Sequence, residues 1–136
     1  MAETVYQCKT KIFPGTDFAE VLVPARQLFH QYEANTRRQA NIRSPLFGKE
    51  KVFLAAFWEH LAKKNRKDKT RRLKFYACAL ELITKATIQP ESQPYRDKQS
   101  TLYRFRGQAS GGQEFVVQIS QNKNGRRYFT SVFPQE

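Results

Sequence analysis

The sequence predicts an α+β fold in which N-terminal helices pack on a C-terminal antiparallel β-meander of three to four strands. Between residues 18 and 86, apolar residues recur at intervals of three and four, which is the spacing of amphipathic helices. From Leu102 to Pro134, three runs of alternating β-branched and aromatic residues are separated by two Gly-containing breaks. Because helices precede strands rather than alternating with them, segregated layers are expected.

A first helix is predicted within residues Phe18–Ala34, which either begins near Val23 with Pro24 in its first turn or is kinked at Pro24. Residues 35–44 are polar and basic, and we predict a connector there. A second helix is predicted from about Lys51, and residues 65–69 are predicted to form a charged loop.

A third helix is predicted from Thr70 to about Ala86, capped by Asp68 or Thr70. Its first turns carry Arg71 and Arg72, although the helix macrodipole favours acidic residues at that end. Arginines at a helix end that disfavours positive charge indicate that these side chains have a functional role. The segment that follows could contain a short strand around Tyr95.

The three C-terminal runs are predicted to place alternate residues on opposite faces of the sheet. In the last run we expect one face to carry Phe129, Ser131 and Phe133, and the other Tyr128, Thr130 and Val132. The apolar face requires the helices as cover, which leaves the other face free for a ligand.

The composition indicates one globular domain of 136 residues with a net charge of +12. Residues Lys49–Lys74 contain 10 basic and 3 acidic residues, whereas residues 1–35 contain 3 and 4. Such a concentrated field attracts a polyanion, and the alternative is a solvated surface that keeps the protein soluble. The sequence has two cysteines, Cys8 and Cys78, and we expect no disulfide framework from them. We also expect neither a signal peptide nor a membrane helix. A cytoplasmic protein without membrane contact is expected.

Several chemistries are not expected from the motifs. The histidines and cysteines are scattered, and the sequence has no Walker loop, dinucleotide fingerprint or GxSxG elbow. We therefore expect neither a metal nor a cofactor. Cleavage of RNA by its own 2′-hydroxyl fits a basic protein, because the protein supplies only an acid, a base and phosphate-binding cations.

His60 is the candidate acid or base, because imidazole titrates near neutral pH. The alternative is that His60 packs under Trp58 or pairs with a carboxylate. The expected RNA contacts are cations, strand aromatics and an amide: Lys63, Lys64, Arg66, Arg71, Arg72, Tyr103, Arg104, Arg106, Gln118 and Tyr128. Ser131 and Thr130 are hydroxyls that could position phosphate. The alternative is structural: the aromatics are core residues, the arginines are solvated, and the hydroxyls belong to ordinary strand residues.

The chain from Trp58-x-His60 through Arg71-Arg72 to Leu102-Tyr103-Arg104-Phe105-x-Gly107 and the closing Ser131-Val132-Phe133-Pro134 resembles a known superfamily. It is the barnase, EndoU, colicin-tRNase and RelE superfamily, in particular its prophage and toxin domains. The resemblance covers residues 45–134 as a nuclease-like core and leaves residues 1–44 as an N-terminal helical extension. It implies a metal-independent ribonuclease whose working residues correspond to His60, Arg72 and Ser131, with Thr130 as the alternative hydroxyl.

The sequence therefore predicts a toxin-like or phage-derived endoribonuclease acting on RNA, with tRNA as one candidate. An acidic inhibitor or immunity protein is an expected partner. Two other hypotheses stay open: a non-catalytic module that binds nucleic acid, and a basic domain that binds an acidic protein.

Overall fold

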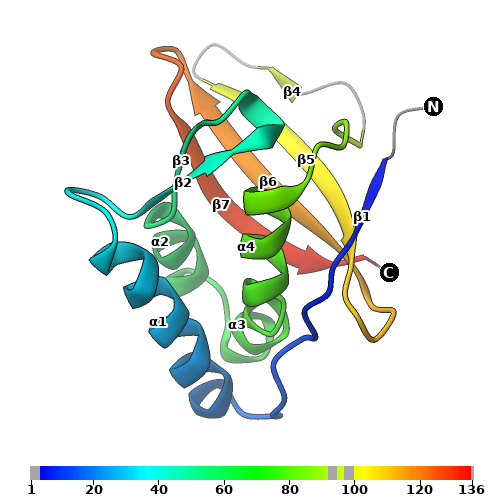
Figure 1. Cartoon of the computed structure of the whole chain (residues 1–136). Coiled ribbons are helices and arrows are strands. Elements are labelled where there is room, and N and C mark those ends of the chain that lie inside the picture. The colour runs from blue at the N-terminus through cyan, green and yellow to red at the C-terminus, as the bar shows by residue number, and fades with distance from the viewer. Residues whose placement is uncertain (1–3, 92–94, 97–99, 136) are drawn as a thin grey trace.

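The computed structural model describes residues 4–91, 95–96 and 100–135. The elements follow in the order β1 (Val5–Gln7), α1 (Phe18–Ala34), β2 (Asn41–Ser44), the 3-10 turn η1 (Pro45–Phe47), β3 (Glu50–Phe53), α2 (Ala56–Ala62), α3 (Arg66–Leu73), α4 (Tyr76–Lys85), β4 (Tyr95–Arg96), β5 (Ser100–Gln108), β6 (Glu114–Asn122) and β7 (Arg127–Pro134). Strands and helices are therefore mixed along the chain (Figure 1).

The sheet has the strand order β1-β5-β6-β7-β3-β2, and β4 also pairs with β5. The pairs β1–β5 and β3–β7 are parallel, and the other pairs are antiparallel. The predicted architecture is wrong on two counts: the sheet is mixed and larger than a meander of three to four antiparallel strands, and the helices are not all N-terminal. The strands that sequence analysis missed, β1, β2 and β3, have only three or four residues each, too few to show a clear alternation.

The strands β5, β6 and β7 form the centre of the sheet and are antiparallel neighbours, as the three C-terminal runs predicted. One face of these strands is apolar: Phe105, Val117 and Phe129 are 1%, 0% and 0% exposed. On this face, Phe57 of α2 stacks on Phe129 with ring centroids 4.9 Å apart. We call it the covered face. The short strand expected around Tyr95 is confirmed as β4.

A bulge in β7 decides which of its residues point to the covered face. Ile119 pairs with Phe129 and Gln118 pairs with Ser131, so that Thr130 is an extra residue between the two pairs. Phe129 and Val132 consequently both lie in the core. The predicted faces of this strand are wrong, because a bulge interrupts the two-residue alternation on which they were based. Ser131 and Phe133 are turned to the opposite face, which we call the open face.

The predicted helix bounds are wrong where the chain forms a strand or where a capping residue starts a helix earlier. α1 covers the whole of Phe18–Ala34 with Pro24 inside it, so the alternative start near Val23 is wrong. The predicted second helix starts too early, because Lys51 lies in β3 and α2 begins at Ala56. The predicted charged loop is mostly helix: the Asn65 side chain accepts a 2.9 Å hydrogen bond from the amide of Asp68, and α3 begins there. The predicted third helix is divided between α3 and α4.

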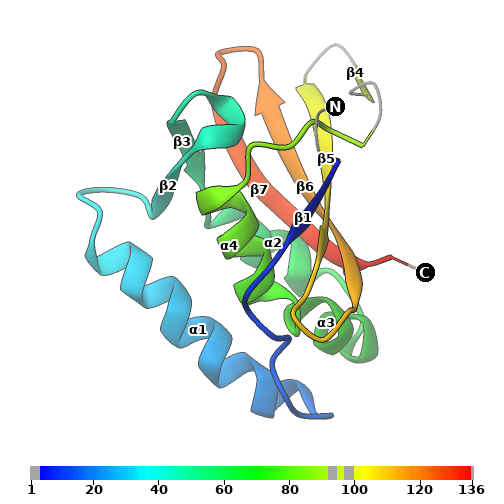
Figure 2. The ribbon, with the colours of Figure 1, turned by 45° about the vertical axis from the view of Figure 1, so that its right-hand side comes forward.

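The layers are visible when the molecule is turned (Figure 2). The helix α4 lies against the sheet, and α1 lies outside α4 and beside α3. The helices α1 and α4 lie on one side of the central strands, whereas α3 lies at the lower end of the sheet in this view and contacts β7. Within the described residues, none of the helices has the length and apolar character needed to cross a membrane.

Glu81 of α4 anchors the chain that follows β1. Its carboxylate accepts hydrogen bonds from the Tyr6 hydroxyl at 2.8 Å, from the amides of Lys9 and Thr10 at 3.0 Å, and from the Thr10 hydroxyl. Burial acts to raise the pKa of Glu81, but these donors outweigh it and hold the pKa below its usual value. The same contact zone brings the free, buried thiols of Cys8 and Cys78 together, although 70 residues separate them in sequence.

Candidate functional site

A hydrogen bond between a helix and the bulged strand is the centre of the candidate site. Nη1 of Arg72, on α3, donates to Oγ of Ser131, on β7, at 2.7 Å. The contact depends on the bulge at Thr130, which turns Ser131 away from the core. Two residues that sequence analysis named for a joint role thus come together across 59 positions of the chain.

Asp68 holds the Arg72 guanidinium in place. Its Oδ2 accepts a 3.1 Å bond from Nε of Arg72, four residues later on α3, and its Oδ1 accepts a 3.0 Å bond from Arg71. Partial burial acts to raise the pKa of Asp68, but the two arginines outweigh it and keep the pKa below its usual value. The carboxylate therefore stays charged and fixes the direction in which Arg72 points.

Phe133 brings a second guanidinium to the same place. The ring centroid of Phe133 lies 5.4 Å from Cζ of Arg72 and 5.9 Å from Cζ of Arg104. Both distances fall within the range of cation–π contacts. Arg104 comes from β5 and Arg72 from α3, so cations from two different elements lie close to the same ring.

Gln118 connects Arg104 to the bulge. Its Oε1 accepts a 3.2 Å bond from Nε of Arg104, and its Nε2 donates to the Thr130 hydroxyl at 3.4 Å. The Thr130 hydroxyl donates in turn to the Gln118 carbonyl at 3.2 Å, and Thr130 is 7% exposed. Its hydroxyl is therefore used in holding the bulge, whereas Ser131 is only partly buried. We call Arg72, Arg104, Gln118, Ser131 and Phe133 the open-face cluster.

The cluster has hydrogen-bond donors that the described contacts do not use. Because an Arg72 N–H occupies a lone pair of the Ser131 oxygen, the Ser131 O–H can donate elsewhere. A guanidinium has five N–H donors, and the described contacts use two of those on Arg72. Two cations, a hydroxyl donor and an amide on one sheet face have the properties required to bind an anion such as a phosphate group.

His60 is not joined to this cluster by any contact within the described residues. It lies in the last turn of α2, is exposed, and its imidazole has no hydrogen-bond or ion-pair partner in the part of the chain that the structure describes. Neither alternative role is seen there: Trp58 packs against Phe29 and Tyr76, and no carboxylate pairs with His60. α2 itself packs on the covered face, where Phe57 stacks on Phe129 of β7, whereas the cluster lies on the open face.

The other predicted cations are distributed over three places. Lys63 and Lys64 are exposed after α2. Arg66 pairs with Asp17 at 3.4 Å, and with Arg71 it lines a hollow of about 650 Å³ between α3 and the start of α1. Arg106 lies 3.8 Å from Glu91 and 3.6 Å from Glu114, so its charge is partly compensated.

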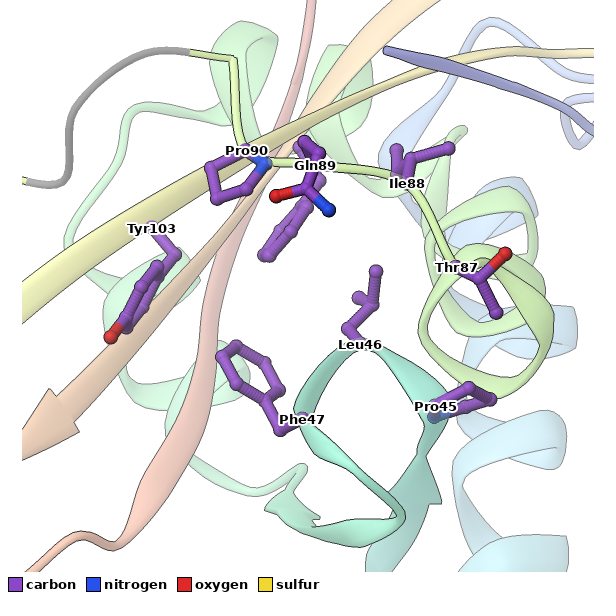
Figure 3. A pocket seen from close by; sticks show the side chains of 9 residues that line it. Pro45, Leu46, Phe47, Thr87, Ile88, Gln89, Pro90 and Tyr103 are labelled. Carbon is purple, nitrogen blue, oxygen red and sulfur yellow. The ribbon is translucent and has the colours of Figure 1, made fainter. Parts of the chain in front are cut away.

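The two predicted aromatic contacts, Tyr103 and Tyr128, lie on opposite faces of the sheet. Tyr103 packs edge-on against Phe47 at 5.3 Å and lines an apolar pocket of about 320 Å³ between η1 and the segment after α4 (Figure 3). That pocket is on the side of Phe105 and is thus separated from the cluster by the sheet. Tyr128 is on the open face, paired with Ser120 and 5.8 Å from the ring of Phe53.

Sequence analysis missed Phe133 and the role of Asp68. Phe133 was taken as a strand residue like its neighbours, and nothing in its local pattern distinguishes it. Asp68 was considered only as a helix cap, although its spacing of four from Arg72 was a usable signal once both are placed on one helix.

The described residues contain no group of three or more His, Cys, Asp or Glu side chains arranged to hold a metal ion. In comparisons with known proteins, no family model, no curated protein and no solved structure matches this chain.

Proposed function

We propose that this protein is an endoribonuclease that cleaves RNA without a metal, by attack of the 2′-hydroxyl on the neighbouring phosphate. The observation that carries the proposal is the 2.7 Å bond between Arg72 and Ser131, with the guanidinium of Arg104 also close to the Phe133 ring. It supports a phosphate site built from a helix and two strands. The concentration of positive charge around α2 and α3 supports a polyanionic substrate, and we propose that the protein acts in the cytoplasm.

The proposed reaction forms a bond from the 2′-oxygen to phosphorus and breaks the bond from phosphorus to the 5′-oxygen. A base takes the proton of the 2′-hydroxyl, and an acid gives a proton to the leaving 5′-oxygen. The products are a 2′,3′-cyclic phosphate and a free 5′-hydroxyl. Negative charge accumulates on the non-bridging oxygens in the transition state, where Arg72, Arg104 and the Ser131 hydroxyl would donate hydrogen bonds.

His60 is the proposed acid or base. Its imidazole is exposed, but α2 packs on the covered face through Phe57, so the proposal requires an RNA bound in the cluster to extend around the sheet to reach His60. A proton-transfer role requires the substrate to complete the site, because His60 has no contact with the cluster within the described residues.

The test is incubation of the purified protein with total RNA and with tRNA in EDTA, beside the His60→Ala and Arg72→Ala proteins. We expect discrete fragments that end in a 2′,3′-cyclic phosphate from the parent protein. Loss of a general acid or base costs ~100-fold or more in rate, so His60→Ala should leave little product.

Lys11→Ala is the matched control, because it removes an exposed cation that is outside the cluster and is not among the predicted RNA contacts. Its cleavage rate should stay close to that of the parent. Undiminished cleavage by His60→Ala would remove His60 from the mechanism, and intact RNA with the parent would reject the nuclease.

The second candidate is a module that binds nucleic acid without cutting it. The observation in its favour is the lack of any contact between His60 and the open-face cluster in the described residues. It predicts a salt-sensitive mobility shift that His60→Ala does not change. An acidic inhibitor protein on the same basic surface is compatible with both candidates, and co-purification after expression with such a partner would identify it.

A further inference from the structure

A second basic hollow lies away from the open-face cluster, and none of its cations belongs to the site already described. It has a volume of about 460 Å³ and is formed by the loop after α1, by β2 and β3, and by the turn between β6 and β7. Four cations line it: Arg37, Arg38, Lys51 and Arg126. We call it the basic pocket.

The charges of the basic pocket are not compensated by the described part of the chain. No carboxylate lines the pocket, and none of its four cations forms an ion pair within the described residues. All four are exposed. By contrast, Arg66, Arg71, Arg72 and Arg106 each have an acidic partner. Four like charges around one hollow repel one another, and a bound anion would relieve that repulsion.

Two aromatic rings connect the basic pocket to the open-face cluster. Phe53 lines the pocket, with the Arg126 guanidinium carbon 5.8 Å from its ring centroid. Phe53 is opposite Tyr128 in the parallel register of β3 and β7, and their ring centroids are 5.8 Å apart. Tyr128 is three residues before Ser131 on β7 and lies on the open face. Arg126, Tyr128 and Ser131 therefore follow one another along β7 and the residue before it, and Phe53 lies beside Tyr128 on β3.

The spacing separates two phosphate positions. Arg126 and Ser131 are five residues apart along an extended chain, which corresponds to roughly 16 Å. One phosphate group cannot span that distance. A nucleic-acid strand can place one phosphate at each end and bases on the rings between them.

We propose that the basic pocket binds a backbone phosphate of a single-stranded RNA whose scissile phosphate lies in the open-face cluster, with the intervening bases stacked on Phe53 and Tyr128. This inference rests on the proposed function for the position of the scissile phosphate. A single strand is required because paired bases in an A-form duplex keep their faces stacked on each other and cannot lie on aromatic side chains.

The first experiment measures binding by fluorescence anisotropy with a labelled 2′-O-methyl uridine oligonucleotide of about 12 nucleotides, which cannot undergo attack by a 2′-hydroxyl. The Arg37→Ala/Arg38→Ala protein should bind it at least ~10-fold more weakly than the parent does, as expected for losing charge-assisted hydrogen bonds. The slope of log K against log salt should become shallower by ~0.7, the value for one phosphate contact of a single strand. Phe53→Leu, which keeps an apolar side chain but loses the aromatic ring, should weaken binding by ~5-fold or more.

The matched control is the Lys9→Ala/Lys11→Ala protein, which loses the same amount of charge from exposed positions after β1. Its affinity should stay within about twofold of the parent, as expected when the lost charges make no phosphate contact. Equal weakening by the two double variants would show that only net charge matters and would overturn the proposal. Binding of a duplex as tight as that of the single strand, through the same arginines, would also overturn it.

Cleavage of a dinucleotide separates the inference from the proposed function. A dinucleotide reaches the cluster but not the pocket, so Arg37→Ala/Arg38→Ala should cleave it as fast as the parent and should lose rate only on the longer strand. If the parent cleaves both substrates and the variant is unimpaired on both, the pocket proposal fails alone. If the parent cleaves nothing but the binding difference remains, the nuclease fails and the pocket stands as part of a binding module.

Discussion

The covered face and the open face of strands β5, β6 and β7 carry different kinds of side chain, although alternate residues of the same strands supply them. On the covered face, Phe105, Val117 and Phe129 are packed in the core. On the open face, Arg104, Gln118 and Ser131 lie side by side in register and contact one another or Arg72. This difference indicates that the covered face stabilises the fold, whereas the open face stays available for binding.

The polar groups of the two regions differ in how fully they are satisfied. The Glu81 carboxylate, on α4, accepts hydrogen bonds from four donors and is a structural anchor. Arg72 and Ser131 keep donors that no described residue accepts. A saturated polar group indicates a structural role, whereas unused donors that converge on an open surface indicate a place for a ligand.

The largest expected effect is on the covered face. Phe129→Ala removes a ring that is 0% exposed and stacked on Phe57, so we expect a loss of ~3–5 kcal/mol in the free energy of unfolding. Urea denaturation followed by circular dichroism measures it. Phe133→Ala, on the open face, is the control and should cost much less stability. Similar losses for both variants would contradict the assignment of the two faces.

Arg72→Ala should affect activity more than stability. Losing a donor aimed at the phosphate should lower the cleavage rate on the order of 10²–10³-fold. The unfolding free energy should fall by no more than ~2 kcal/mol, because Asp68 keeps its bond to Arg71. Arg71→Ala is the control, since it leaves the bond between Arg72 and Ser131 in place. A parallel loss of activity in both variants would indicate that only charge matters.

Acid should weaken the fold through Glu81 and Asp68. Both have folded-state pKa values below their usual range, so their contribution is present above the unfolded pKa of about 4 and is lost as the pH falls through the folded pKa. Glu81→Gln should cost ~1–3 kcal/mol at neutral pH, and the difference from the parent should shrink on acidification below ~pH 4. Denaturation curves across this range test it, and a difference independent of pH would contradict it.

The smallest expected effects distinguish the two neighbouring hydroxyls. Ser131→Ala should lower the cleavage rate by ~10-fold for one lost hydrogen bond to a charged group and leave stability nearly unchanged. Thr130→Val should cost ~1 kcal/mol of stability, because the Thr130 hydroxyl bonds to Gln118 within the bulge. Rates and unfolding curves for both variants, in parallel, decide between the hydroxyls. The reverse pattern would assign the phosphate contact to Thr130.

Local patterns in the sequence were sufficient for the elements that are long enough to show a period. The presence of α1 and of the three strands β5, β6 and β7 follows from spacing alone, because each contains several repeats of its period. Arg72, Arg104 and Ser131 were also recognisable as residue types suited to phosphate. What stays a prediction is the role of His60, which the described contacts do not connect to them.

Contacts between distant parts of the chain produced the rest. The parallel partners β1 and β3 are short, and their pairing with β5 and β7 is a long-range contact that no local window contains. The bulge at Thr130 results from the fit of β7 to β6, and it alone turns Ser131 toward Arg72. The basic pocket likewise joins Arg38, Lys51 and Arg126 from three separate segments. Residue chemistry is local, but a binding site depends on which residues the folded chain brings within a few ångströms of one another.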